Sequence, residues 1–97
     1  MSVACRFVRE MGLTHREFFR ELPAALAPHR YRADGNRVRV CIGRGSLLIT
    51  LGSERIRRIA ALRLPCTAVD FAFEGVDDDE RERFMWRFDL CFRRGGG

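Results

Sequence analysis

The feature that most restricts the fold is the alternating run RVRVCI at residues 37–42. Apolar side chains at every second position are typical of a β-strand with one buried face and one exposed face. Further extended segments follow at residues 46–51, 54–64 and 67–74, and residues 2–10 alternate in the same way. Asp34-Gly35 predicts a turn before residue 37, and a short additional strand at Tyr31 is left open.

The strands between residues 37 and 74 are predicted to form an antiparallel meander. The dipeptides that suit its tight turns are Arg44-Gly45, Gly52-Ser53 and Pro65-Cys66. With these turns, Val40 faces Ile49 and Ile49 faces Ile56, while Leu62 faces Val69. Every pair is apolar with apolar, as a sheet with one buried face requires.

Two helices complete the predicted set of elements. Thr14 and Glu17 have the spacing of a capping box at the start of the first helix, and Pro23 predicts a bend or an early stop in it. The second helix follows the acidic run at residues 77–79, which suits a helix N-terminus. Its apolar stripe consists of Phe84, Met85, Phe88, Cys91 and Phe92.

These elements predict an α+β domain in the order β-α-β-β-β-β-α. Both apolar helix stripes suit the same side of the antiparallel sheet, so the other sheet face is expected to be open and rich in arginine. A chain of 97 residues is suited to a single domain. We expect this domain to span residues 1–94, followed by a flexible glycine tail at residues 95–97.

The open face is the predicted functional surface. Its arginines in this register are Arg37, Arg39, Arg55, Arg57 and Arg63. Asp70 and Glu74 are the only acids expected on the same face, with Glu74 opposite Arg57, so a surplus of about three positive charges is expected there. Such a face could contact water alone, an acidic part of its own chain, a partner subunit or a polyanion.

The basic residues are unevenly distributed and of one kind. The net charge of +5 arises from +8 over residues 1–63 (13 arginines, 5 acids) and −3 over residues 64–97 (5 arginines, 8 acids). All the basic residues are arginine, which a GC-rich bacterial-like genome would explain without any function. Whatever their origin, guanidinium groups bind carboxylate and phosphate through forked hydrogen bonds.

The remaining candidate residues indicate no cofactor. Cys5, Cys41, Cys66 and Cys91 lack zinc-site spacing and are expected to be reduced thiols, with Cys66 the most reactive because it lies in a predicted turn. His15 and His29 are expected at the surface. Trp86 lies off the apolar stripe of the second helix and is either packed at its edge or an exposed anchor for a partner.

We therefore expect a small non-catalytic binding or assembly domain rather than an enzyme. The arginine-rich face would contact an acidic protein partner or a second copy of the chain in a homo-oligomer. The alternative is a nucleic-acid-binding module that uses the same face. The sequence has no apolar run of the roughly 18 residues that a membrane helix needs and no signal-peptide pattern, so a cytoplasmic location is expected.

Overall fold

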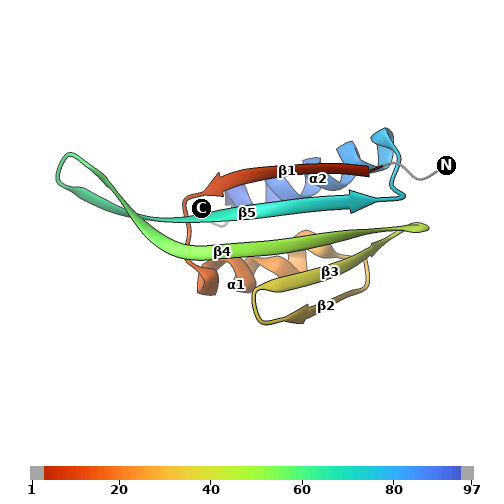
Figure 1. Cartoon of the computed structure of the whole chain (residues 1–97), viewed down its shortest axis with the longest axis horizontal. Coiled ribbons are helices and arrows are strands. Elements are labelled where there is room, and N and C mark those ends of the chain that lie inside the picture. Colours follow the sequence, from red (N-terminus) through yellow and green to blue (C-terminus); the bar gives the residue numbers. More distant parts are fainter. Residues whose placement is uncertain (1–3, 95–97) are drawn as a thin grey trace.

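The computed structural model describes residues 4–94, so the predicted glycine tail lies outside the described residues. Its strands form one antiparallel sheet in the order β1-β5-β4-β3-β2, with both helices behind it (Figure 1). The elements are β1 (Ala4–Met11), α1 (His15–Leu26), β2 (Tyr31–Asp34), β3 (Arg37–Ile42), β4 (Gly45–Ile59), β5 (Leu62–Glu74) and α2 (Asp78–Arg94). The predicted α+β class and element order are confirmed. Neither α1 nor α2 is long and apolar enough to cross a membrane.

The strands differ from the predicted ones in where they turn. The segment at Tyr31 is a strand, and the three segments predicted at residues 46–51, 54–64 and 67–74 are two long strands, β4 and β5. Ile42 pairs with Gly45, and Ile59 pairs with Leu62. The turns are therefore at residues 43–44 and 60–61, and all three predicted turn positions are wrong.

Gly52 and Pro65 lie inside strands for identifiable reasons. The register shifts between Leu51 and Glu54, so Gly52-Ser53 forms a β-bulge in β4 instead of a turn. Pro65 pairs with Ile56 on β4, while β1 ends at Met11 opposite Thr67 and leaves the other edge of β5 unpaired at this point. Proline is tolerated at such an edge because no ladder partner needs its missing N–H.

The core lies between the helices and the sheet. In the observed register Val40 faces Leu47 and Ile49 faces Phe71. Phe88 of α2 packs edge-on against Phe71, with ring centroids 5.2 Å apart. The fully buried residues Phe18 and Leu22 line the inner side of α1.

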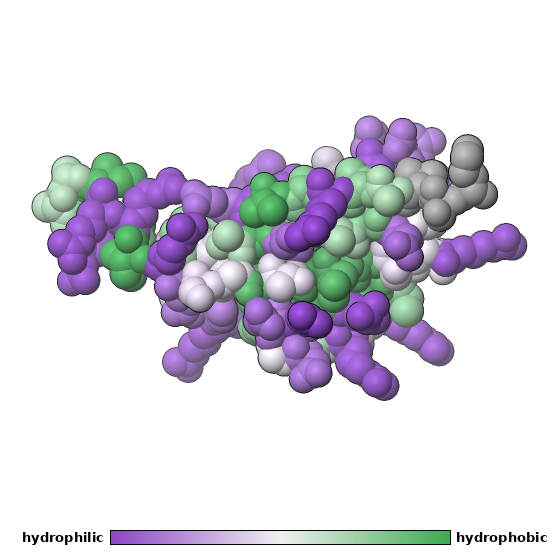
Figure 2. All heavy atoms as spheres, in the orientation of Figure 1, coloured by the Kyte–Doolittle hydropathy of each residue, from purple (hydrophilic) through white to green (hydrophobic). Residues whose placement is uncertain are grey.

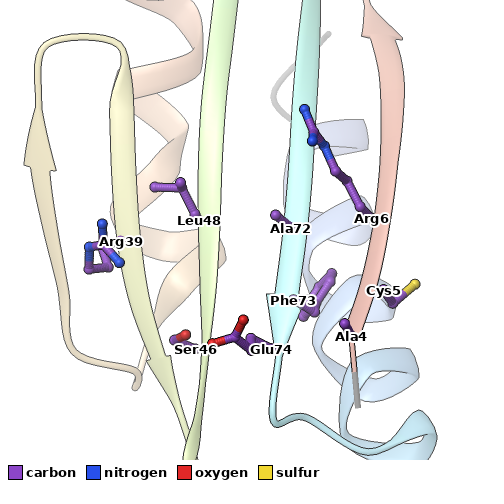
Figure 3. A pocket seen from close by; sticks show the side chains of 9 residues that line it. All are labelled: Ala4, Cys5, Arg6, Arg39, Ser46, Leu48, Ala72, Phe73 and Glu74. Carbon is purple, nitrogen blue, oxygen red and sulfur yellow. The ribbon is translucent and has the colours of Figure 1, made fainter. Parts of the chain in front are cut away.

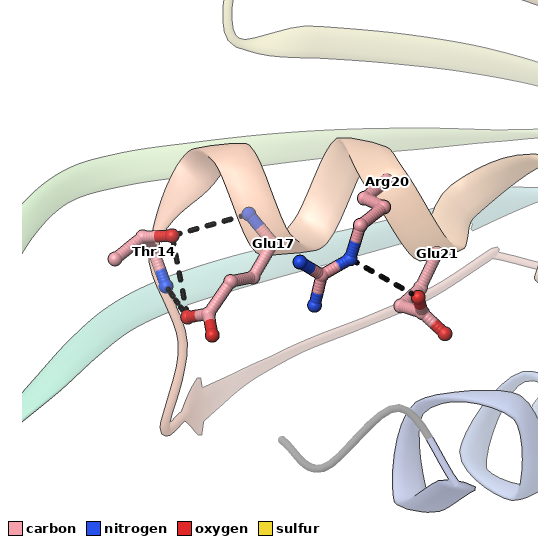
Figure 4. Close-up of polar contacts among 4 residues, drawn as sticks. All are labelled: Thr14, Glu17, Arg20 and Glu21. Carbon is pink, nitrogen blue, oxygen red and sulfur yellow. Dashed lines mark hydrogen bonds and ion pairs between the residues drawn. The ribbon is translucent and has the colours of Figure 1, made fainter.

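The start of α1 follows the sequence prediction, but its end does not. Thr14 and Glu17 form the predicted capping box (Figure 4). The helix continues through Pro23 to Leu26, so it does not stop early at the proline. The amide of Ala27 donates to the Pro23 carbonyl oxygen over 3.1 Å and completes the last turn.

The far end of the β4–β5 hairpin projects beyond the rest of the molecule (Figure 1). We call residues 54–65 the arm. The β4 segment of the arm, residues 54–59, is six residues long, which corresponds to about 20 Å at the usual rise per residue. The chain accordingly measures 49 × 25 × 22 Å along its principal axes. Residues 52–64 are all exposed to solvent.

Candidate functional site

A cross-strand pair of arginines lies on the open face of the sheet. Arg32 of β2 is directly opposite Arg39 of β3, and Arg37 is opposite Asp34. Like charges directly opposite each other destabilise a sheet. Within the described part of the chain, Arg32, Arg37 and Arg39 make no ion pair within 4.0 Å. Arg32 was not predicted as part of this face, because the sequence left open whether a strand forms at Tyr31.

The surface around this pair is shallow and mixed in character. A depression of about 270 Å³ is lined by Arg32, Asp34, Arg37, Arg39 and Leu48. A neighbouring depression of about 470 Å³ extends toward β1, with Arg39 and Arg6 on either side of Leu48 and Ala72 (Figure 3). Figure 2 shows the same face with pale and green residues near the centre and purple side chains around them.

Asp70 is bound by Arg6 of β1. Arg6 donates to both carboxylate oxygens of Asp70, the shortest contact being 2.7 Å from Nη2 to Oδ2. These hydrogen bonds, and secondarily the negative charge, raise the pKa of the Arg6 guanidinium. Glu74 faces Ser46 and Ala4, so the predicted pairing of Glu74 with Arg57 is wrong.

Arg55 and Arg57 lie at the base of the arm and share a carboxylate from β1. Arg55 Nη2 lies 2.7 Å from Glu10 Oε1, and Arg57 pairs with the other oxygen of Glu10. Only Asp70 and Glu74 were expected as acids on this face, and Glu10 was missed because the sequence did not indicate that β1 lies beside β5. The bulge switches the side-chain alternation of β4, which directs Arg55 and Arg57 to the same side of the sheet as Glu10.

Arg63 does not belong to the same face as Arg55 and Arg57. It lies directly opposite Arg58, one position along from the pair of Arg57 and Leu64. Side chains alternate between faces, so Arg58 and Arg63 lie on the other side of the arm. They form a second cross-strand arginine pair, and neither makes an ion pair with any of residues 4–94 within 4.0 Å. The sequence missed Arg58 because the turn was predicted in the wrong place.

The single tryptophan and the cysteines bear on partner binding and reactivity. Trp86 is 69% exposed on α2, on the opposite side of the sheet from the open face. Its role as a partner anchor remains a prediction. Cys66 lies within β5 and is only 6% exposed, so its predicted position in a reactive turn is wrong, whereas Cys41 is exposed.

Both histidines are half-buried rather than fully exposed. His15 contacts the bulge through its ring, and the ring of His29 packs against Phe84 with centroids 5.6 Å apart. Asp77, the first residue of the acidic run, caps α2, because its Oδ1 accepts from the amide of Glu80 over 2.8 Å. Among residues 4–94 no group of three or more His, Cys, Asp or Glu side chains is placed to hold a metal ion.

The two arginine pairs are suited to holding oxyanions. A carboxylate or phosphate between two guanidinium groups accepts forked hydrogen bonds from both and reduces their mutual repulsion. The pair on the open face (Arg32 and Arg39) and the pair on the arm (Arg58 and Arg63) are separate surfaces on different strand pairs. No protein-family model matches the chain, and no curated protein matches it in sequence.

Proposed function

We propose that this chain is a non-catalytic binding domain that contacts an acidic surface of another protein through the open face of its sheet. The observation that carries the proposal is the uncompensated pair of Arg32 and Arg39 on adjacent strands. A partner carboxylate between these guanidinium groups would replace a repulsive contact with two charge-assisted hydrogen bonds.

The neighbouring residues support a protein partner. Leu48 lies opposite Arg39 on β4, and Ala72 lies beside it on β5. Interfaces between proteins combine an apolar centre with arginine, which is enriched among the residues that dominate binding energy. The exposed acids Asp78 and Asp79 of a second copy have suitable chemistry, so a homo-oligomer is one form of this proposal.

The test uses fluorescently labelled poly-L-glutamate as an acidic polypeptide, with binding measured by anisotropy at low salt. The double variant Arg32→Ser/Arg39→Ser should bind about tenfold more weakly than the parent, because two charge-assisted contacts are lost. The control variant Arg83→Ser/Arg87→Ser removes the same charge from exposed positions on α2 and should bind like the parent. An equal loss in both variants would mean that only net charge matters.

Self-association is measured separately by sedimentation equilibrium of the unlabelled protein. If the acidic partner is a second copy, the apparent mass rises with concentration and falls again in Arg32→Ser/Arg39→Ser. The variant Asp78→Asn/Asp79→Asn should weaken the dimer to a similar extent. A monomer at all concentrations, combined with polyglutamate binding, points to a different acidic protein.

A further inference from the structure

The arm is held firmly where it leaves the sheet. The Asn36 side-chain amide donates to the Leu51 carbonyl oxygen over 2.8 Å, and the Leu51 amide donates to the Asn36 carbonyl oxygen over 2.8 Å. The His15 amide donates to Glu54 Oε1 over 2.7 Å. Contacts from the β2–β3 turn and from α1 therefore hold β4 on either side of the bulge.

The β1 side of the base is attached as well. Glu10 holds Arg55 and Arg57, and the buried hydroxyl of Thr67 donates to the Leu13 carbonyl oxygen over 2.8 Å. An arm attached in this way keeps its direction away from the body. Its outer residues, which are exposed throughout, must therefore be covered by another molecule if they are covered at all.

The outer part of the arm exposes apolar side chains on both of its faces. Ile56 is 55% exposed on one face, and Ile59 and Leu62 are 52% and 60% exposed on the other. Figure 2 shows green residues among purple ones at the projecting end. A two-stranded hairpin alone is only marginally stable in water. Exposed apolar side chains at its end therefore favour the binding of another molecule there.

The charge of the arm restricts what can cover it. Residues 54–65 hold four arginines and one glutamate, a net charge of +3. Pairing of two arms from two copies would bring eight arginines together, which like-charge repulsion opposes. A flat acidic surface would contact only one face of the ribbon, yet arginine occurs on both, as Arg55 and Arg57 on one and Arg58 and Arg63 on the other.

We infer that the arm inserts into the major groove of B-form DNA. This groove is about 12 Å wide and admits a two-stranded β-ribbon, and phosphates line both of its walls. Arginines on the two faces of the arm would then contact opposite walls. Ile59 and Leu62, next to the turn, would reach the groove floor, where thymine methyl groups offer apolar contacts. Binding would depend mainly on phosphate contacts, with modest sequence preference.

The arm is a surface separate from the Arg32–Arg39 pair, so either proposal can fail without the other. The probe is a labelled mixed-sequence DNA duplex, titrated between about 50 and 200 mM salt. Arg55 and Arg57 share the negative charge of Glu10, so the four arginines correspond to about three phosphate contacts, and log K should fall against log[salt] with a slope of about −3. The variant Arg58→Ser/Arg63→Ser should make this slope shallower by about 2, whereas the charge-matched control Arg83→Ser/Arg87→Ser should leave it unchanged.

Two further measurements test insertion rather than general attraction. The variant Ile59→Ser/Leu62→Ser should lose affinity while keeping the parent salt slope, because it changes apolar contacts only. An RNA duplex of the same sequence should bind more weakly than DNA, since the major groove of A-form RNA is too narrow for side chains to read.

Several outcomes overturn the inference. Absence of DNA binding by the parent at low salt would be one, and an unchanged salt slope in Arg58→Ser/Arg63→Ser would be another. Insertion into the groove would be contradicted if the RNA duplex bound with equal affinity, or if Ile59→Ser/Leu62→Ser lost no affinity. A loss of DNA binding in Arg32→Ser/Arg39→Ser, with the arm variants unaffected, would place the DNA on the open face instead. All of these variants change exposed side chains, so their melting curves should match that of the parent.

Discussion

The ring nitrogen Nε2 of His15 lies 2.6 Å from the carbonyl oxygen of Gly52, which joins the first turn of α1 to the bulge in β4. A carbonyl oxygen only accepts hydrogen bonds, so Nε2 carries the hydrogen in this contact. The amide of the same histidine donates to Glu54. A single residue at a helix N-terminus therefore supports both the bulge and the first residue of the arm.

Replacing His15 should loosen the base of the arm. In His15→Ala the Gly52 carbonyl loses its ring partner, a loss of about 0.5–1.5 kcal/mol in local stability. Amide hydrogen exchange at residues 51–57 should become a few-fold faster, with little change in Tm. The control His29→Ala removes a ring that packs against Phe84 and should leave exchange in this segment unchanged. Equal protection in His15→Ala and the parent would show that the contact carries no stability.

Phe88 is the centre of the aromatic core. It is fully buried and packs against Phe71, and also against Phe92 with ring centroids 4.5 Å apart. Phe88→Ala should lower the free energy of unfolding by about 3–5 kcal/mol, a large part of the stability of a small domain. Thermal melting should show a Tm lower by more than about 12 °C. The exposed Trp86 two positions earlier is the control, and Trp86→Ala should melt close to the parent.

The four thiols should differ in their reaction rates with a thiol reagent. Cys41 is exposed on β3 and should react first, whereas Cys66 is 6% exposed within β5 and should react last. Peptide mapping by mass spectrometry during a labelling time course gives the order. If Cys66 were labelled before Cys41, the result would contradict its position inside β5. That order is the one expected for a turn at residues 65–66.

The turn at the tip of the arm contains a backbone conformation that suits glycine. Ala60 has a φ of +56°, in the left-handed region that costs a residue with a Cβ about 1–2 kcal/mol. Ala60→Gly removes this strain, and the gain exceeds the added flexibility of glycine, which is worth about 0.5–1 kcal/mol. Amide exchange at residues 56–64 should therefore slow down. The control Ala61→Gly adds only flexibility, so exchange should become faster there.

Thr67 is the only buried polar residue among those that the structure describes, and its hydroxyl satisfies the Leu13 carbonyl oxygen. The near-isosteric Thr67→Val leaves this carbonyl without that partner. We expect a loss of about 1–3 kcal/mol in the free energy of unfolding, measured by urea denaturation. Thr50→Val on the open face is the matched control and should change stability by less than about 0.5 kcal/mol. Equal midpoints for the two variants would contradict the role of this hydrogen bond.

The helices and the order of the elements could be predicted from the sequence because their signals are local. The capping box of Thr14 and Glu17 and the apolar stripe around Phe88 each depend on residues within one or two helical turns. Alternation likewise identified β3 and the arginines on its open side. These features depend on backbone geometry and short-range contacts, which the order of residues determines directly.

The register of the long hairpin was decided only by the tertiary structure. Moving a two-residue turn by one residue shifts every cross-strand partner by two, so apolar residues still face apolar ones. Turns at residues 52–53 and 65–66 therefore looked as consistent as the single real turn at residues 60–61. What selects the real register is contact from distant residues, as His15, Asn36 and Thr67 hold the bulge and the arm base in place. The arm itself, the Arg58–Arg63 pair and the partnership of Glu10 with Arg55 all follow from that choice. Alternation along a strand tells which side chains share a face, but only packing between distant segments decides which strands lie side by side.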